Sequence, residues 1–262
     1  MRILTSFMLK SALSTLLVLS MMFSAGPVSQ AQAEDANLIP GSFSGSMAFV
    51  TEYRYRGLDQ SDDHPAIQGS FDWSHEKGYY LGIWGSNVDF GDTDQGNTEF
   101  DIYGGVARQY YGVDIDLGFV YYAYPGANDS LQYDFFEYKV GLGYAWELLS
   151  LSGSLNYSPE FFGATGNALY MSYDADVPLR HGFGLALHVG RQWTTDSAAY
   201  GTGGVDAGRD YVDWSAGLNY STHGFDLNVT YVDTDLTTSD KPTGADDTVI
   251  FGVSRSRSEE RR

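Results

Sequence analysis

The sequence predicts an all-β fold: a transmembrane antiparallel β-barrel of about twelve strands, with short periplasmic turns and long extracellular loops. Three observations support this. Apolar and polar residues alternate along most of the chain, and the connections between the alternating runs are short and long in turn. The composition also suits a wall with two unlike faces, because 15% of the 262 residues are aromatic and only 19% are charged, with a mean hydropathy of −0.25. A disordered chain would lack these aromatic residues.

Residues 1–33 resemble a secretory signal peptide. Arg2 and Lys10 give a positive start, 13–23 is an apolar run, and Ala31-Gln32-Ala33 matches a cleavage site. The apolar run is too short for a spanning helix, although a membrane anchor is the alternative. We therefore expect Sec-type export and a periplasmic N-terminal segment at 34–42.

Charge and cysteine content exclude several classes of protein. The formal net charge is −19, whereas a nucleic-acid-binding surface needs the opposite sign. Cysteine is absent, which excludes a disulfide framework, a thiolate zinc site and a cysteine nucleophile. No segment after the leader approaches the roughly 18 apolar residues of a membrane helix.

A period of two residues predicts each strand. In the run 113–121, Val113, Ile115 and Leu117 share one face while Asp114 and Asp116 share the other. The runs at 149–157, 183–189 and 225–231 alternate in the same way. The apolar runs approach the about 9–11 residues that a tilted membrane strand needs. We expect twelve strands, at 43–56, 66–75, 79–89, 98–109, 113–123, 135–147, 149–158, 168–179, 183–193, 211–221, 225–234 and 247–256, and hence a barrel over 43–256.

The connections alternate in length. Tight ones follow every second strand, at 76–78, 110–112, 147–148, 180–182 and 222–224, and four of the five contain a Gly, which provides the positive φ of hairpin turns. The others are longer and polar, at 57–65, 90–97, 124–134, 159–167, 194–210 and 235–246. Short connections at one end of the strands and long ones at the other are typical of an outer-membrane barrel with both termini on the periplasmic side. A soluble secreted β-protein, the alternative, has no reason to show it.

Aromatic residues gather near the expected strand ends, as interfacial girdles do. An ordinary aromatic β-core is the alternative explanation. The residues concerned are Tyr53, Tyr55, Trp73, Tyr79, Tyr80, Tyr110, Tyr111, Tyr121, Tyr124, Trp146, Trp193, Tyr211 and Tyr220.

The segment 50–61 (VTEYRYRGLDQS) resembles the opening signature of the TorF family of proteobacterial outer-membrane porins. Further matches are 65–69 (PAIQG), 80–90 (YLGIWGSNVDF), 99–105 (EFDIYGG) and 121–126 (YYAYPG). The resemblance extends over essentially the whole mature chain and is most specific over 50–126. It implies a porin-type barrel in the outer membrane of a Gram-negative bacterium, without an agreed substrate.

The C-terminus departs from the usual pattern. The last expected strand (249–256, VIFGVSRS) is followed by a charged tail at 257–262 rather than by the terminal aromatic residue that the barrel-assembly machinery recognises in such proteins. The missing terminal aromatic residue affects the expected assembly signal and leaves the expectation of a barrel unchanged.

If the apolar faces contact lipid, the opposite faces line a lumen. We expect more acidic than basic groups there, which favours cation entry; the alternative is that the acids are solvated, neutralised by Ca²⁺ or paired and select nothing. The candidate lumen residues are Glu52, Arg54, Arg56, Asp72, Asp101, Asp114, Asp116, Glu137, Lys139, Asp174, Asp176, His188, Asp213 and Asp226.

Arg54 and Arg56 are two residues apart, so we expect both to project inward from the first strand, with Glu52, near the extracellular mouth. Such a column is a candidate constriction, and a cross-strand salt-bridge ladder is the alternative. Asp59, Asp62, Asp63 and His64 follow in the first outer loop. They are suited to a divalent ion, or they face water and lipopolysaccharide-bound cations.

No catalytic residue, cofactor or metal is expected. A twelve-stranded barrel can carry a phospholipase with a Ser and a His on its wall, and His188 is the one inward histidine. The sequence contains neither G-x-S-x-G nor H-E-x-x-H.

These features together predict passive diffusion of small hydrophilic solutes, with a mild cation preference. The alternative is a non-conducting barrel with an adhesive or structural role, because Tyr, Arg and Glu can fill a lumen of twelve strands. The expected partners are outer-membrane lipids and lipopolysaccharide, small solutes or ions and the barrel-assembly machinery. No nucleic acid is expected.

Overall fold

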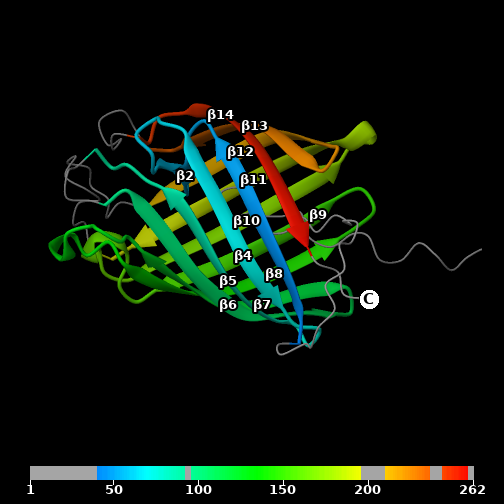
Figure 1. Cartoon of the computed structure of the whole chain (residues 1–262), viewed down its shortest axis with the longest axis horizontal. Helices are drawn as coiled ribbons and strands as arrows, with labels where there is room; N and C mark the ends of the chain where they lie inside the picture. The colour runs from blue at the N-terminus through cyan, green and yellow to red at the C-terminus, as the bar shows by residue number, and fades with distance from the viewer. Residues whose placement is uncertain (1–39, 92–95, 196–209, 237–243, 259–262) are drawn as a thin grey trace, which may run out of the picture.

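The computed structural model describes residues 40–91, 96–195, 210–236 and 244–258, and within them twelve strands close into one antiparallel barrel (Figure 1). Neighbours in the sequence are neighbours in the wall, and β1 closes the ring by pairing with both β14 and β4. The fold class expected from the alternation is confirmed. The strands of the wall are β1 Ser42–Val50, β4 Ala66–Ser74, β5 Tyr79–Asn87, β6 Thr98–Tyr110, β7 Val113–Ala123, β8 Phe135–Ala145, β9 Ser150–Ser158, β10 Ala168–Pro178, β11 Phe183–Thr194, β12 Tyr211–Thr222, β13 Phe225–Thr234 and β14 Thr248–Ser258.

Helical structure is limited to three short 3-10 turns, η1 Asp129–Leu131, η2 Phe162–Ala164 and η3 Arg180–Gly182. None of the helices in the described ranges has the length and apolar character to cross a membrane.

The two ends of the barrel differ in their connections, as the parity of loop lengths predicts. One end, here called the turn end, carries the tight connections and also the first residue of β1 and the last of β14 (Figure 1). At the turn between β6 and β7, Tyr111 (φ 51°) and Gly112 (φ 84°) both have positive φ, which matches the twist of a two-residue hairpin. The other end, the loop end, carries the long connections.

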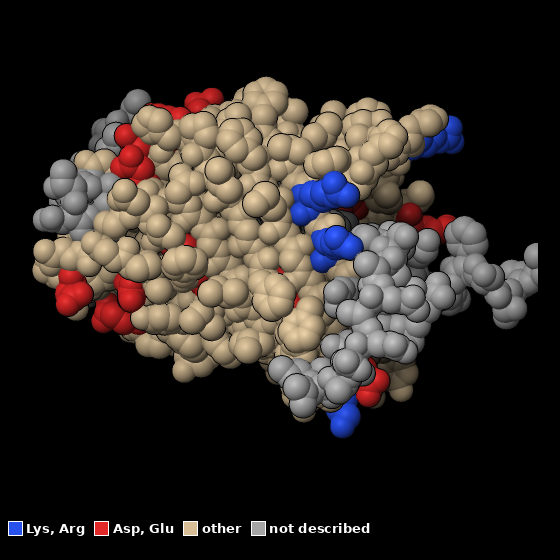
Figure 2. Space-filling model, viewed as in Figure 1, with Lys and Arg blue, Asp and Glu red and all other residues tan. Residues whose placement is uncertain are grey.

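The outer surface is apolar over most of its height. Large apolar side chains are well exposed there, including Met47 at 67%, Leu142 at 55% and Phe251 at 54%. On the face shown in Figure 2, Asp and Glu are most frequent at the loop end, whereas the visible Lys and Arg lie toward the turn end. A closed wall of this kind leaves no unpaired strand edge.

The strands at the closing pair of the barrel differ from the expected ranges. β1 ends at Val50 rather than at 56, because the chain turns at Arg56 (φ 50°) and Gly57 (φ 80°) and forms a small separate hairpin of β2 Arg54–Tyr55 and β3 Leu58–Asp59. β14 continues to Ser258, where Arg257 pairs with Gly45 and Ser258 with Ser44. The first two residues of the expected tail therefore belong to the wall. The expected signal peptide and most of the segment 34–42 lie outside the described residues.

The expectation for the aromatic residues was wrong for five tyrosines. Two of them are partly buried inside the barrel, where Tyr55 donates to Tyr122 and Tyr80 donates to Asp116. Tyr79, Tyr110, Tyr111 and Trp146 are exposed near strand ends, as girdle residues would be. Tyr53 is 3% exposed, Tyr124 6% and Tyr211 4%. These three lie inside the loop end, because chain from the connections folds into the barrel there.

Candidate functional site: the barrel interior

The loop end of the lumen is occupied by residues 51–61, here called the inner hairpin. Its residues Tyr53, Arg54, Arg56, Leu58 and Ser61 are all buried. The hairpin is closed internally, since the backbone N–H of Tyr53 donates to Ser61 Oγ at 2.9 Å. Leu58 packs in an apolar cluster with Tyr211, Leu236 and Ala245 at the same end of the barrel. The inner hairpin is therefore a packed element rather than a loop extending into solvent.

Arg56 crosses the lumen to the opposite wall. Its Nη2 donates to both oxygens of Glu137 on β8, at 2.8 and 2.7 Å, and its Nη1 donates to Gln192 on β11 at 2.7 Å. The guanidinium also lies over the rings of Tyr55 and Tyr170, 4.7 and 4.1 Å from their centroids. Burial alone would lower the pKa of Arg56, but the Glu137 carboxylate outweighs it and holds that pKa well above its usual value.

Arg54 ties the base of the inner hairpin to the closing strand pair. It forms a buried ion pair with Glu52 and donates to the carbonyl oxygen of Gly244, just before β14. Thr248 on β14 in turn donates to Glu52 at 2.8 Å. Because the strand ends before them, Arg54 and Arg56 do not form the expected column on the first strand, and they bind opposite sides of the lumen. The expected constriction at these residues stays a prediction.

An aromatic layer surrounds the inner hairpin. Tyr122 on β7 stacks on Phe135 of β8 with ring centroids 4.1 Å apart, and Phe135 meets Phe161 edge-on at 4.8 Å. Phe162 and Tyr133 stack at 4.3 Å in the loops that follow. All five side chains are at most 7% exposed. The loop half of the interior is therefore filled by close-packed side chains.

His188 on β11 lies between two carboxylates. Its Nδ1 is 2.6 Å from Asp174 and its Nε2 is 3.0 Å from Asp213, and Tyr170 donates to Asp213 at 3.0 Å. Gly190 leaves room for this group, because a Cβ there would lie 1.9 Å from Tyr170 Oη. The hydrogen bonds of His188 thus go to carboxylates and a phenol rather than to the serine that a hydrolase would need.

The turn half of the interior is different. Asp114, Asp116 and Lys139 point inward from β7 and β8 and are partly exposed. Lys139 Nζ lies 3.1 Å from Asp116, which also accepts from Tyr80 at 2.8 Å. Several surrounding inward positions are Gly; Tyr80 and Tyr103 lie over some of them, whereas an added Cβ at Gly143 or Gly184 would have its nearest neighbour 3.7 Å away. This half is polar and partly exposed.

The predicted lumen residues all lie inside the barrel or the inner hairpin. Asp72, Asp101, Glu137, Asp174 and Asp213 are buried. Asp176 and Asp226 are partly exposed, as are those named for the turn half. The prediction missed Glu99, which is 1% exposed. Glu99 precedes Asp101 by two residues on β6, so the alternation alone contained the signal that places it in the lumen.

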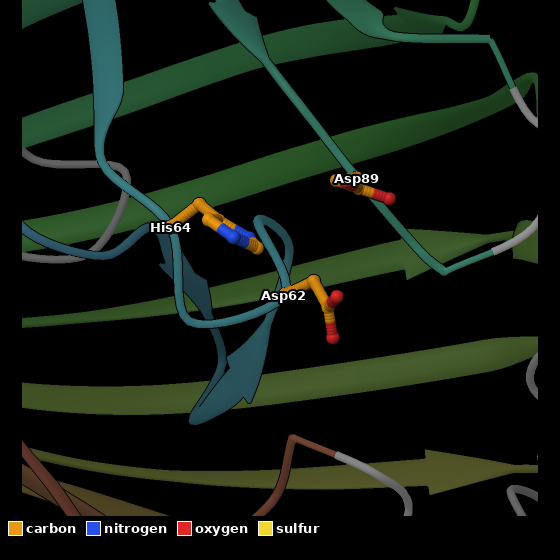
Figure 3. Close-up of side chains that lie close together, drawn as sticks. All are labelled: Asp62, His64 and Asp89. Atoms are coloured by element: carbon orange, nitrogen blue, oxygen red, sulfur yellow. The ribbon is translucent and has the colours of Figure 1, made fainter.

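Two groups of side chains resemble metal-ligand sets. Asp62 and His64 of the first loop lie with Asp89, which follows β5, and their ligand atoms are within 4.8 Å of one another (Figure 3). A backbone bridge between Ser61 and Asp89 joins the two segments, which sequence spacing could not have revealed. The second group is Glu52, Asp59 and Asp63, and Arg54 contacts Glu52 and Asp63 of it. The first group is exposed to solvent apart from the half-buried Asp89.

Comparison with known proteins supports the fold. Residues 34–256 match the model of a family described as a bacterial protein of unknown function (Gcw_chp), a description that leaves the TorF resemblance a prediction. A search of curated proteins finds no match. Among solved structures, the NanC porin and the KdgM porin each align at a TM-score of 0.52 and 8% identity, over 84% of this chain and 100% and 99% of theirs. An outer membrane channel from Pseudomonas putida F1 aligns at 0.49 and 10% identity, over 88% of this chain and 100% of that one.

Proposed function

Because the chain belongs to the Gcw_chp family of bacterial proteins of unknown function and folds as a closed barrel, we propose that it is an outer-membrane porin for small hydrophilic solutes. One observation carries the proposal: a continuous apolar surface surrounds a polar interior in a ring without edges. Only closed barrels and helices satisfy the backbone within a lipid bilayer. The likeness to the two porins agrees with this and concerns the fold.

Export and membrane location form part of the same proposal. The leader would direct Sec-type export, the barrel-assembly machinery would insert the chain, and the loop end would face lipopolysaccharide. Fractionation with the outer membrane and a faster-migrating band on an unboiled gel are the expected results. A protein that stays in the soluble periplasmic fraction would contradict the location.

A mild cation preference is the finer part of the proposal. Each of the fixed cations Arg54, Arg56 and Lys139 lies against a carboxylate, so the interior keeps an excess of acidic groups. Acidic rings select cations. Reversal potentials across planar bilayers in a salt gradient test this directly, and a clear anion preference would refute it.

A non-conducting barrel is the second candidate, favoured by the filled loop half. Arg56, Glu137 and the aromatic layer occupy that part of the lumen and are buried there. The decisive measurement is conductance of the purified, folded protein, together with liposome swelling over sugars, amino acids and organic acids. Solute entry supports the porin, whereas silence in every assay supports an adhesive or structural role.

A further inference from the structure

Two carboxylates are buried next to each other inside the loop half. Glu99 and Asp101 both point inward from β6, and they are 1% and 0% exposed. Tyr53 of the inner hairpin, 3% exposed, lies beside Glu99. Four oxygen atoms of this group have no hydrogen-bond partner among the described residues: Glu99 Oε2, both carboxylate oxygens of Asp101, and Tyr53 Oη.

The surroundings do not neutralise this pair. Glu137 is the next carboxylate, and Arg56 already binds both of its oxygens. Within the described parts of the chain, neither Glu99 nor Asp101 forms an ion pair. An ionised carboxylate taken out of water without a partner is strongly unfavourable, so buried acids are paired, coordinate a cation or keep a proton.

Aromatic side chains keep water from the pair. Asp101 is flanked in register by Trp84 on β5 and Tyr122 on β7, both buried. Tyr53 meets Trp84 edge-on with ring centroids 5.5 Å apart. Tyr124 donates to Glu99 Oε1 at 3.2 Å, whereas Glu99 Oε2 is buried without a hydrogen-bond partner among the described residues.

We propose that Glu99, Asp101 and Tyr53 bind one hard divalent cation of the Ca²⁺ type inside the barrel. The donor set consists of oxygen atoms, which hard cations prefer, and two carboxylates balance a double positive charge. Ca²⁺ suits a dry, irregular oxygen site better than Mg²⁺, which gives up its water reluctantly. The site does not depend on whether the barrel conducts.

The cation would also join two parts of the molecule. Tyr53 belongs to the inner hairpin, whereas Glu99 and Asp101 belong to the wall. A bound ion therefore holds the inner hairpin against β6, which only β7 separates from the strand that carries Glu137. Loss of the ion is expected to loosen the contact of the hairpin with β6 first.

The experiment uses the full-length mature protein, folded in detergent and freed of metal with chelator. Binding of Ca²⁺ alone is measured by equilibrium dialysis, with the unboiled-gel mobility shift as a check of folding. We expect one saturable site per chain and an unfolding temperature raised by about 5 °C or more at saturating Ca²⁺. Glu99→Gln/Asp101→Asn should lose both effects while remaining folded, because its buried groups are neutral.

Two control variants separate this site from the acidic loops. Asp246→Asn/Asp247→Asn removes the same charge from exposed positions, and Asp62→Asn/His64→Gln removes the solvent-exposed cluster of Figure 3. Both should keep the saturable site. Absence of saturable Ca²⁺ binding in the wild type would overturn the proposal in favour of a carboxyl pair that shares a proton. Loss of the site in either control, or its survival in the Glu99→Gln/Asp101→Asn variant, would overturn it as well.

Discussion

The two halves of the barrel interior are built from the same alternating strands and yet differ in almost every property. At the turn end, partly exposed Asp114, Asp116 and Lys139 stand among Gly and Ser positions. At the loop end, Arg56, Glu137 and stacked aromatic rings are all buried inside the barrel. The strands form the wall in both halves. The loop half is filled by the inner hairpin and residues of the long connections together with inward side chains of the wall, such as Tyr122 and Glu137.

The largest expected effect comes from removing the inner hairpin. Replacing residues 53–60 by a short Gly-Ser linker deletes Tyr53, Arg56 and Leu58 from the lumen while the wall stays complete. We expect single-channel conductance to rise several-fold and liposome swelling to extend to larger sugars.

The same linker inserted at the turn between Tyr111 and Gly112 is the control, and it should leave conductance unchanged. If the hairpin replacement folds and conducts no better than the wild type, the loop half is not what limits passage.

The next largest effect is expected from Arg56→Met. It leaves Glu137 buried without its cation, which should destabilise the protein by about 3–5 kcal/mol. Urea unfolding followed by tryptophan fluorescence measures the change. Arg56→Met/Glu137→Gln removes both charges and should recover most of the loss. Additive losses in the double variant would show that the contact across the lumen contributes little.

A matched pair of glycine substitutions compares the halves directly. At Gly190, in the loop half, a Cβ would lie 1.9 Å from Tyr170 Oη and 2.7 Å from Asp213, whereas at Gly143, in the turn half, the nearest atom would be 3.7 Å away. Gly190→Ala should cost about 1–3 kcal/mol through overpacking, and Gly143→Ala about 0.5 kcal/mol or less. Equal effects at the two sites would contradict the closer packing at Gly190.

A smaller effect is expected from Asp114→Asn in the turn half. This side chain is partly exposed, and its carboxylate accepts from Gln109 at 3.0 Å. Water screens such a charge, so the cation-to-anion permeability ratio should fall by less than about twofold and stability should be unchanged within about 0.5 kcal/mol. Reversal potentials of the wild type and of Asp114→Asn, each with and without the inner hairpin, measure the change in the permeability ratio. A larger drop would show that the turn half, and not the filled half, sets selectivity.

The smallest effect concerns pH. Partial burial raises the pKa of Asp59 in the inner hairpin above its ordinary value, against the hydrogen bonds from Ser61 and Asp63. Ionised Asp59 therefore weakens the packing of the hairpin, and this weakening disappears as the pH falls through the raised pKa. Closed periods in bilayer recordings should lengthen slightly as the pH falls from neutral toward the ordinary range of a carboxyl pKa, and Asp59→Asn should flatten the trend. Closed periods that shorten on acidification would contradict the expected direction of the pH effect.

The contrast between the halves also shows how far the sequence predicts this molecule. Alternation predicted all twelve strands and the inward direction of Asp101, Glu137 and Asp213, since a residue's face depends only on its neighbours in the strand. The path of residues 51–61 could not be predicted in this way. Arg54 and Arg56 keep the inward phase of β1, but the positive φ at Arg56 and the partners across the lumen depend on Glu137 and Gln192, which are 81 and 136 residues further along the chain.

The exposed group of Asp62, His64 and Asp89 also could not be predicted from the sequence. Asp62 and His64 are close in sequence, while Asp89 joins them only through a bridge between two connections. Tyr53, Tyr124 and Tyr211 were assigned to the membrane interface because position along a strand does not tell whether a loop folds outward or inward.

The contacts of Arg54 have a consequence for the order of events during assembly. The base of the inner hairpin is held by Gly244 and Thr248, about 190 residues later in the chain, and Thr51 donates its backbone N–H to Phe251 on β14 at 2.9 Å. These partners exist only once the last strand has joined the first. A nascent barrel would therefore keep a vacant lumen until closure, and contacts of such long sequence separation form late. Closing the wall and filling the loop half of the lumen are then one and the same step of folding.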